Sequence, residues 1–343
     1  MRASIVGGDS SHYGDVWFRG HFTATGAETG VTLDGSGGHY GTYAAWLNGR
    51  YLGSQTSSAS SDSTGPTTYT FPAGSLKPGT DNVVSLLLEN MGHDEDGLSN
   101  DSHKAPRGFT QAALHGSSAP ISWRVQGAVG GQQNVENVND PTRGPFNNGG
   151  LYGERMGWYL PGFDDSSWTP LTLPDRWQPR GVPPGVGWYR TGFDLNLPAG
   201  TDAPIGLRIA DDTFGKPGAA HYKALIYLNG WLVGRYWNNL GPQTRFYLSA
   251  GILNPNGHNQ VAIASWGLDQ SGGGLGAVNL EAYGAYAGGV PVGLVSSPGV
   301  GGAGGAGSGP TATPEPGSGV LYGTGLTALL AGLLAWRRYR ERV

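Results

Sequence analysis

Three groups of neighbouring carboxylates are the residues of this sequence best suited to acid–base chemistry: Asp94-Glu95-Asp96, Asp164-Asp165 and Asp211-Asp212. Cleavage of a glycosidic bond needs two carboxyl groups facing one bond, about 5 to 10 Å apart. Each group, however, stands in a turn-like context, where an aspartate commonly accepts hydrogen bonds from its own backbone. We therefore expect solvated turns, with no catalytic residue. A structural Ca²⁺ site is the next alternative, because clustered carboxylates suit a hard cation.

A second group combines aromatic rings with amides and has the composition of a sugar site. Its members are Trp231, Trp237, Asn238, Asn239 and Gln243. A sugar site needs an apolar platform and a few convergent polar groups, and this stretch offers both. The alternative, and the favoured one, is that the tryptophans belong to the core of the fold while the amides order a loop. These five residues are our candidate carbohydrate-binding residues.

Several other chemistries have no residues to carry them. The sequence has no cysteine, which excludes disulfides, thiolate metal sites and a cysteine nucleophile. Its eight histidines show no paired metal-binding spacing, so we predict no metal ligand and no cofactor beyond the Ca²⁺ alternative. The net charge is −4, and lysine and arginine are scattered until the last few residues. Nucleic acid is therefore not expected as a partner.

The elements that position these residues are predicted to be strands. A sequence with 62 glycines and 23 prolines would suit a disordered chain, but 11 tryptophans and 16 tyrosines argue against disorder. Short strands joined by turns give this composition, and the apolar runs at 83–88 and 261–266 are typical of buried central strands. We predict an all-β fold of sandwiches or barrels.

The strand pattern occurs twice, in the same order. Residues 17–22 (WFRGHF) match 188–193 (WYRTGF), and residues 45–53 (AWLNGRYLG) match 226–234 (IYLNGWLVG). A third pair, 71–86 and 248–263, follows in both copies. Three collinear matches indicate a duplicated domain. In each copy the Leu-Asn-Gly segment predicts a hairpin, because asparagine and glycine both tolerate the positive φ of a type I′ turn.

This order of motifs resembles the jelly-roll domains of β-galactosidases in glycoside hydrolase family 35. Three further stretches resemble parts of these enzymes. Residues 234–246 (GRYWNNLGPQTRF) look like the signature of their last jelly roll, and residues 90–96 (NMGHDED) with 106–108 (PRG) look like the end of the preceding one. Residues 161–168 (PGFDDSSW) resemble the opening of sugar-binding sandwich domains in other β-galactosidases. The resemblance covers residues 10 to 290.

The resemblance implies two tandem jelly-roll β-sandwiches of the galactose-binding-like type. We place the first in residues 1–126 and the second in residues 127–295. Residues 296–316 are rich in Gly, Ala, Ser and Pro and poor in large apolar side chains, which indicates a flexible linker. Residues 317–343 form the tail.

One part of the family pattern is missing from this sequence. In the family, two glutamates on an N-terminal (β/α)₈ barrel serve as acid/base and nucleophile, and no such barrel is found here. The chain is either a piece of a longer enzyme or a product whose catalytic part is encoded elsewhere or lost. We expect an accessory portion of a surface-anchored β-galactosidase, inactive alone, whose partners are β-galactoside glycans and a catalytic barrel in cis or in trans. The alternative is a free-standing carbohydrate-binding or adhesive surface module.

The tail predicts a membrane anchor. Pro314-Glu315-Pro316 precedes an uncharged stretch at 317–336, and Arg337 and Arg338 follow that stretch. At about 1.5 Å per residue, a helix of this length just covers the hydrocarbon core of a bilayer. The arrangement resembles the PEP-CTERM sorting tail of exosortase-processed bacterial proteins, which is cut near Pro-Glu-Pro, with a plain C-terminal transmembrane helix as the alternative. Arginines on the cytoplasmic side would place the sandwiches outside, at the surface of a bacterial cell.

Overall fold

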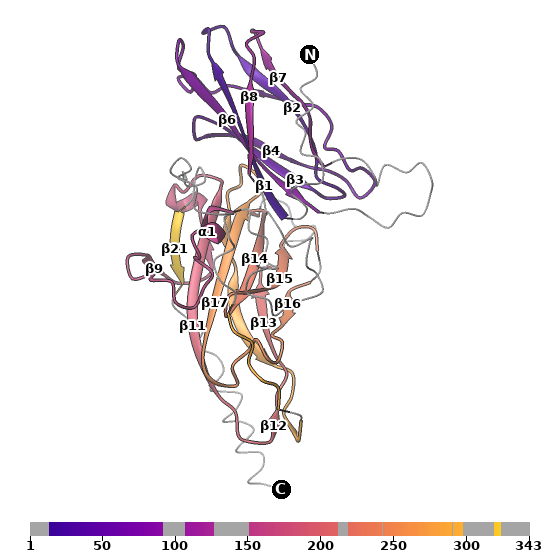
Figure 1. The fold of residues 1–343 in the computed structure, drawn as a ribbon, viewed down its shortest axis with the longest axis vertical. Helices are drawn as coiled ribbons and strands as arrows, with labels where there is room; N and C mark the ends of the chain where they lie inside the picture. The colour runs from indigo at the N-terminus through magenta and orange to yellow at the C-terminus, as the bar shows by residue number, and fades with distance from the viewer. Residues whose placement is uncertain are drawn as a thin grey trace. The chain divides into compact units, whose positions relative to one another are not determined.

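The structure is a computed structural model that describes residues 14–91, 107–126, 151–211, 219–241, 243–289, 291–297 and 319–323. Nearly all its elements are strands, so the predicted all-β fold is confirmed (Figure 1). The chain divides into two compact units, whose main boundary falls between Arg155 and Met156. The predicted domain limit at 126/127 borders a segment outside the described residues, and the predicted domain limits stay predictions.

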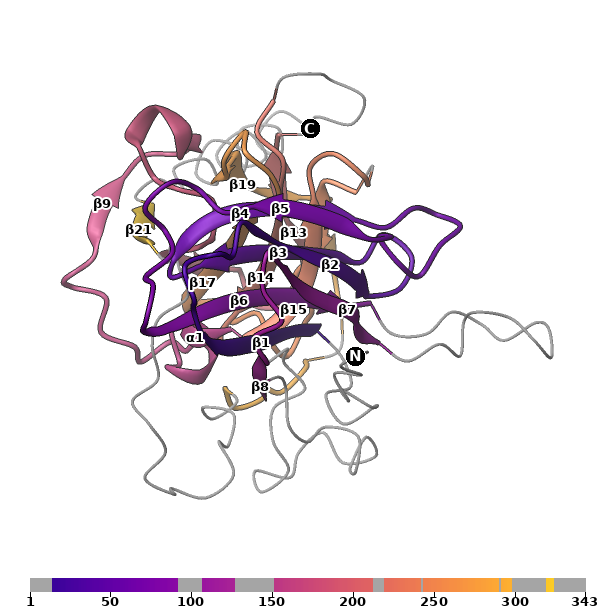
Figure 2. The ribbon, with the colours of Figure 1, turned by 90° about the horizontal axis from the view of Figure 1, so that it is seen from above.

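The first unit is a sandwich of two antiparallel sheets, with strand orders β4-β3-β6-β1-β8 and β5-β2-β7. Figure 2 shows β4, β3, β6 and β1 following one another across the larger sheet. The strands are β1 (Gly14–Thr23), β2 (Gly30–Ser36), β3 (Thr42–Leu47), β4 (Arg50–Thr56), β5 (Thr67–Thr70), β6 (Asp81–Asn90), β7 (Gly108–His115) and β8 (Ser122–Gln126).

The second unit repeats this plan with sheets β15-β14-β17-β11-β21-β9 and β16-β13-β19. Its main strands are β11 (Val186–Asn196), β13 (Ile205–Ala210), β14 (Tyr222–Leu228), β15 (Trp231–Trp237), β16 (Arg245–Tyr247), β17 (Asn256–Gly267) and β19 (Ala277–Ala282). Shorter elements are α1 (Tyr152–Arg155, in the first unit), the 3₁₀ turn Gln178–Arg180, β9 (Thr169–Leu171), β10 (Asp175–Arg176), β12 (Thr201–Asp202), β18 (Gly274–Leu275), β20 (Tyr286–Ala287) and β21 (Gly319–Gly323).

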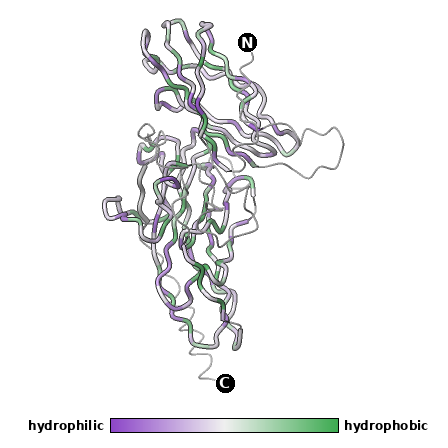
Figure 3. Tube along the Cα trace, in the orientation of Figure 1, coloured by the Kyte–Doolittle hydropathy of each residue, from purple (hydrophilic) through white to green (hydrophobic). Residues whose placement is uncertain are grey.

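The topology shows the duplication that the sequence predicts. In the larger sheets β4-β3-β6-β1 corresponds to β15-β14-β17-β11, and in the smaller sheets β5-β2-β7 corresponds to β16-β13-β19. Each sandwich has its own core of inward-facing side chains. On β14, for example, alternate residues from Tyr222 to Leu228 belong to the core, as the period of two in a strand requires. In Figure 3 the hydrophobic stretches run along the strands of each unit.

Both Leu-Asn-Gly segments form the predicted hairpin turns. Asn48 between β3 and β4 has φ 50°, and Asn229 between β14 and β15 has φ 49°. Each asparagine side chain also reaches to a second asparagine near the start of the neighbouring strand. Asn48 Nδ2 donates to Asn82 Oδ1 (2.8 Å), and Asn229 Nδ2 donates to Asn259 Oδ1 (2.9 Å). The turn asparagine therefore ties the hairpin to the central strand β6 or β17.

The last glycine of each Leu-Asn-Gly-x-x-x-Gly motif lets the two sheets approach. A Cβ on Gly53 would collide with the ring of Tyr69, and a Cβ on Gly234 would collide with the ring of Phe246. Both rings belong to the facing sheet, on β5 and β16 respectively. The motif thus encodes a contact between sheets as well as a turn, because only glycine leaves room for the ring.

The segment that contains Trp158, Tyr159 and Asp165 packs on the larger sheet of the second unit, and the described part of the first unit has no counterpart to it. The ring of Tyr159 lies 5.2 Å from that of Tyr227 on β14, centroid to centroid. Below this segment the buried side chain of Arg190 on β11 donates through Nε to Asp165 (2.7 Å) and through another nitrogen to the Trp158 carbonyl. The pair fixes the segment to the sheet, because a buried guanidinium needs its partners.

A histidine–aspartate pair joins equivalent strands in both units, with the two residue types exchanged. In the first unit His21 on β1 lies 2.9 Å from Asp81 on β6. In the second unit the aspartate, Asp194, stands on β11, and the histidine, His258, stands on β17 at 3.0 Å. Since β11 corresponds to β1 and β17 to β6, each residue type has changed strand.

The described part of the tail corrects one expectation. Residues 319–323, at the start of the predicted membrane helix, form β21, which pairs in parallel with β11 and β9. The segment Gly-Val-Leu-Tyr-Gly has branched and aromatic residues between glycines, a composition that suits a strand, and hydropathy alone does not reveal this preference. Within the described residues no helix is long and apolar enough to span a membrane. Pro314, Glu315, Pro316, Arg337 and Arg338 lie outside them.

Candidate functional site

The predicted carbohydrate-binding residues lie on β15 and in the loop that follows it. Trp231 and Trp237 stand at the two ends of this seven-residue strand. Six residue steps of about 3.3 Å separate them by roughly 20 Å, so the structure does not bring the two rings together. The orientation of the Trp231 indole is also fixed, because its Nε1 donates to the Ser296 carbonyl (3.1 Å).

The three amides of the prediction have different surroundings. Asn238 is fully buried, and its side chain accepts from the Tyr222 N–H (2.9 Å) and donates to the Ala220 carbonyl (2.8 Å). This side chain orders the loop, as the favoured alternative proposed. Gln243 is exposed and donates to the Arg245 carbonyl (3.2 Å), while Asn239 is half-buried. Binding of a sugar by this group stays a prediction.

Trp237 belongs instead to a row of side chains across three strands. Lys223 on β14 is the direct partner of Trp237 on β15 and of Trp266 on β17. The Lys223 ammonium lies 3.7 Å from the centre of the Trp266 ring and 5.4 Å from that of Trp237. A cation over indole faces is held by electrostatic attraction. Neither indole Nε1 has a hydrogen-bond partner within the described residues.

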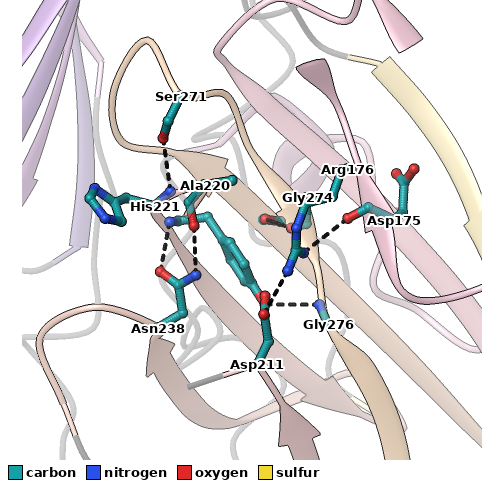
Figure 4. Close-up of polar contacts among 11 residues, drawn as sticks. Asp175, Arg176, Asp211, Ala220, His221, Asn238, Ser271, Gly274 and Gly276 are labelled. Carbon is teal, nitrogen blue, oxygen red and sulfur yellow. Dashed lines mark hydrogen bonds and ion pairs between the residues drawn. The ribbon is translucent and has the colours of Figure 1, made fainter. Parts of the chain in front are cut away.

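At the same end of the second sandwich, Asp211 is the centre of a closed hydrogen-bond network (Figure 4). Arg176 donates to one carboxylate oxygen of Asp211 (2.6 Å), and the hydroxyl of Tyr222 donates to the other (2.8 Å). The same hydroxyl accepts from the Gly276 N–H (2.9 Å). Burial and the Asp211 charge raise the pKa of Tyr222 well above its ordinary value, so the hydroxyl keeps its proton.

Asp175 has a matching set of partners. Arg180 donates to one of its oxygens (2.8 Å) and the Tyr189 hydroxyl to the other (2.9 Å). That hydroxyl in turn accepts from Trp177 Nε1 (2.8 Å). Burial and the Asp175 charge raise the pKa of Tyr189 well above its ordinary value. Arg176 belongs to the Asp211 network. Burial lowers the pKa of its guanidinium, but the hydrogen bond and the charge of Asp211 raise that pKa by more, so the pKa is raised overall.

These networks hold loops rather than a reacting group. Each oxygen of Asp175 and Asp211 is occupied by a donor from the chain, and each tyrosine hydroxyl both donates and accepts. Every one of these donors belongs to the chain itself, so the contacts that the structure shows are structural ones. The arrangement instead joins β10 and the loop after β13 to the central strands, and it sets the geometry of one end of the sandwich.

The other predicted carboxylates are accounted for only in part. The Ser166 N–H donates to Asp164 (3.0 Å) and lowers the pKa of that carboxyl, which is the turn that the sequence predicts. Asp165 differs from a simple solvated turn, because it pairs with the buried Arg190. The segment 94–96 and Asp212 lie outside the described residues. No cluster of three or more metal-ligating side chains occurs in the described part of the chain.

Sequence reasoning missed the network around Asp175. One signal was available, because Tyr189 stands at a core-facing position of a predicted strand, and a buried tyrosine hydroxyl usually finds a partner. The partners were not readable, since Asp175 and Trp177 precede the strand in a segment without a strand or helix period.

Comparison with known proteins gives a consistent result. The sequence matches the family described as the beta-galactosidase second all-beta domain over residues 3–94 and 152–271. Probable beta-galactosidase E of Aspergillus fumigatus is 38% identical over 272 residues, which cover 79% of this chain and 26% of that protein. Probable beta-galactosidase A of Emericella nidulans is 40% identical over 268 residues, covering 76% and 25%. The chain thus spans about a quarter of the length of these curated relatives.

Among solved structures, a family 78 rhamnosidase of Bacillus sp. GL1 is similar with a TM-score of 0.28 at 15% identity, over 80% of this chain and 32% of the rhamnosidase chain. This structural similarity is weak. The family match covers more than half of the chain, with one range in the first unit and a second range mostly in the second unit. The chain belongs to the family of the beta-galactosidase second all-beta domain.

Proposed function

We propose that this chain is the accessory, non-catalytic jelly-roll portion of a glycoside hydrolase family 35 β-galactosidase. The main support is the 38 to 40% identity to β-galactosidases of which the chain spans only about a quarter. In this proposal a catalytic barrel, in cis or in trans, hydrolyses terminal β-galactosides, and the sandwiches support it and contact the glycan.

The accessory role leads to a direct experiment. The purified full chain is assayed for hydrolysis of nitrophenyl β-galactoside, alone and with the remainder of the Emericella nidulans relative, from which the matched region has been deleted. We expect no hydrolysis by the chain alone, and binding to the remainder together with a gain in its activity. Hydrolysis by the chain alone would refute the non-catalytic role. A chain that neither binds nor activates the remainder would refute the accessory role.

Surface anchoring is part of the proposal and rests on the sequence of the tail. Pro314-Glu315-Pro316 comes first, an apolar stretch at 324–336 follows β21, and Arg337 and Arg338 come last, which is the order of elements in a sorting tail. Expression in a bacterium, followed by separation of membrane and soluble fractions, tests it. We expect the full chain in the membrane fraction and the variant truncated after residue 316 in the soluble fraction. Equal distribution of the two would refute the anchor.

A free-standing carbohydrate-binding module is the second candidate. One observation favours it: three tyrosines of the second unit, Tyr247, Tyr283 and Tyr286, are exposed. Such a module would bind a glycan without any catalytic partner. The association experiment above separates the two candidates, because only an accessory portion is expected to bind the remainder of the relative.

A further inference from the structure

The outer face of the smaller sheet in the second unit carries exposed aromatic rings. Tyr247 on β16 is 52% exposed, and Tyr283, directly after β19, is 44% exposed. Phe246, next to Tyr247, belongs to the core, so the period of two turns Tyr247 outward. The Tyr283 ring lies against Gly206, the cross-strand partner of Tyr247, and so lies on the same outer face. Three of the four exposed tyrosines in the described part of the chain lie in this region of the second unit.

A glycine lets one of these rings lie flat against the sheet. Gly206 on β13 is the direct cross-strand partner of Tyr247 on one side and of Glu281 on the other. A Cβ on Gly206 would collide with the Tyr283 hydroxyl and would lie only 2.6 Å from the ring carbon that bears it. The end of the Tyr283 ring therefore lies over Gly206, and the two tyrosines border one flat position on the sheet.

Charged side chains complete this surface, which we call the tyrosine face (Tyr247, Tyr283, Gly206, Arg208, Arg245 and Glu281). Arg245 on β16 donates through Nε to Glu281 on β19 (2.7 Å), and Arg208 on β13 lies 3.5 Å from the other Glu281 oxygen. Arg245 is 54% exposed and uses only Nε within the described residues. Its remaining N–H groups are therefore available to a ligand, in a position that the ion pair fixes.

The first sandwich shows that the fold does not require this surface. From the strand registers, the positions of Tyr247, Arg245 and Glu281 correspond to Thr70, Thr68 and His115. Thr32 of the first sandwich corresponds to Arg208. Thr68 and His115 both hydrogen-bond to its hydroxyl oxygen, at 2.7 and 2.5 Å. The same sheet is thus covered by short polar side chains in one copy and by tyrosine and arginine in the other.

From these observations we infer that the tyrosine face is a binding surface for an oligosaccharide. The rings of Tyr247 and Tyr283 supply the apolar platform on which a sugar ring stacks, and Arg245 and Glu281 supply hydrogen bonds to hydroxyl groups. Tyrosine and arginine are also common in protein interfaces, but burying the Arg245–Glu281 ion pair under a protein would cost the hydration of both charges, whereas a sugar hydroxyl can hydrogen-bond to them. The inference rests on the carbohydrate contact of the proposed function and names its surface, and it does not depend on a catalytic partner.

The test measures sugar binding by the full chain and its variants. Titration calorimetry with galactotetraose, cellotetraose and mannotetraose identifies the probe that binds most tightly. We expect Tyr247→Ala and Tyr283→Ala each to weaken that binding about tenfold or more, through the loss of one stacking ring. The matched control is Thr70→Ala at the equivalent position of the first sandwich, and it is expected to bind like the unaltered chain. Thermal unfolding of each variant confirms that the fold is kept.

Glu281→Gln is a second variant, which tests the charged part of the surface separately from the tyrosine rings. It removes the charge that fixes Arg245 but leaves both rings, so we expect weaker binding than in the unaltered chain and stronger binding than in either tyrosine variant. This order would not follow if the tyrosines acted only through folding.

Three outcomes would overturn the inference. They are no binding of any of the three probes, binding that the double variant of Tyr247 and Tyr283 leaves unchanged, and loss of association with the catalytic partner in Tyr247→Ala without any sugar binding. The last outcome would make the face a protein interface. None of these measurements uses hydrolysis, so the inference and the proposed function can fail separately.

Discussion

The side chain of Asn229 is expected to stabilise the second sandwich by more than a turn residue usually does. Its Nδ2 donates to the Ile252 carbonyl (2.7 Å) and to Asn259 (2.9 Å), and its Oδ1 accepts from the Gln260 N–H (2.8 Å). Each bond contributes about 1 kcal/mol net, and a non-glycine residue such as alanine adds about 1 kcal/mol of strain at positive φ. Asn229→Ala should therefore lower the free energy of unfolding by about 3 to 5 kcal/mol.

Asn229→Gly separates the two contributions. It loses the same three hydrogen bonds but accepts the positive φ of this turn (49°) without strain. We expect it to be destabilised by about 1 kcal/mol less than Asn229→Ala. The free energies come from urea unfolding of the full chain, followed by tryptophan fluorescence, with Asn196→Ala, an exposed asparagine of β11, as the control.

The duplicated fold supplies an internal check. Asn48→Ala removes the matching bonds of the first sandwich, so we expect it to shift the unfolding of that unit by a similar amount. If Asn229→Ala and Asn229→Gly both change the free energy of unfolding by less than about 1 kcal/mol, the three hydrogen bonds do not stabilise the hairpin.

Three further predictions concern other single residues. Gly234→Ala should destabilise the chain by about 1 to 3 kcal/mol in urea unfolding, because its Cβ would overlap the ring of Phe246; an unchanged midpoint would show that the sheets can separate freely. Arg190→Met should cost about 3 kcal/mol in the same assay because it leaves Asp165 without its partner, and a neutral result would mean that water replaces the pair. Burial opposes the charge of Glu28, but hydrogen bonds lower its pKa from 4.5 to about 2, so its stabilising effect is present above pH 4.5 and is lost as the pH falls toward 2. The melting temperature of Glu28→Gln should accordingly lie below that of the unaltered chain at pH 6 and approach it near pH 2, whereas a constant difference would contradict the assigned cause.

The fold was predictable because its signals are local. The Leu-Asn-Gly turns need only two adjacent residues that tolerate positive φ, and the repeat made the second turn an independent confirmation of the first. The tie between Asn229 and Asn259 was not predictable, because these residues are thirty positions apart and meet only when β14 lies beside β17.

The sites were harder to predict, for a geometric reason. Trp231 and Trp237 are close in sequence, but an extended strand carries them to opposite ends. The tyrosine face shows the converse, because Arg208, Arg245 and Glu281 are far apart in sequence and become neighbours through strand register. Nearness in a strand sequence is therefore a poor guide to a shared site.

The exchanged histidine–aspartate pairs have a consequence for how two similar sandwiches fold within one chain. Tandem repeats can misfold by trading equivalent strands. If β1 paired with β17, the strand register would place His21 diagonally across from His258; the complementary pairing of β11 with β6 would set Asp194 opposite Asp81. The pairing of β11 with β6 would set two carboxylates against each other, which is unfavourable between adjacent strands, and the pairing of β1 with β17 would leave both histidines without their aspartates. The exchange thus favours strand pairing within each repeat over strand pairing between the two repeats.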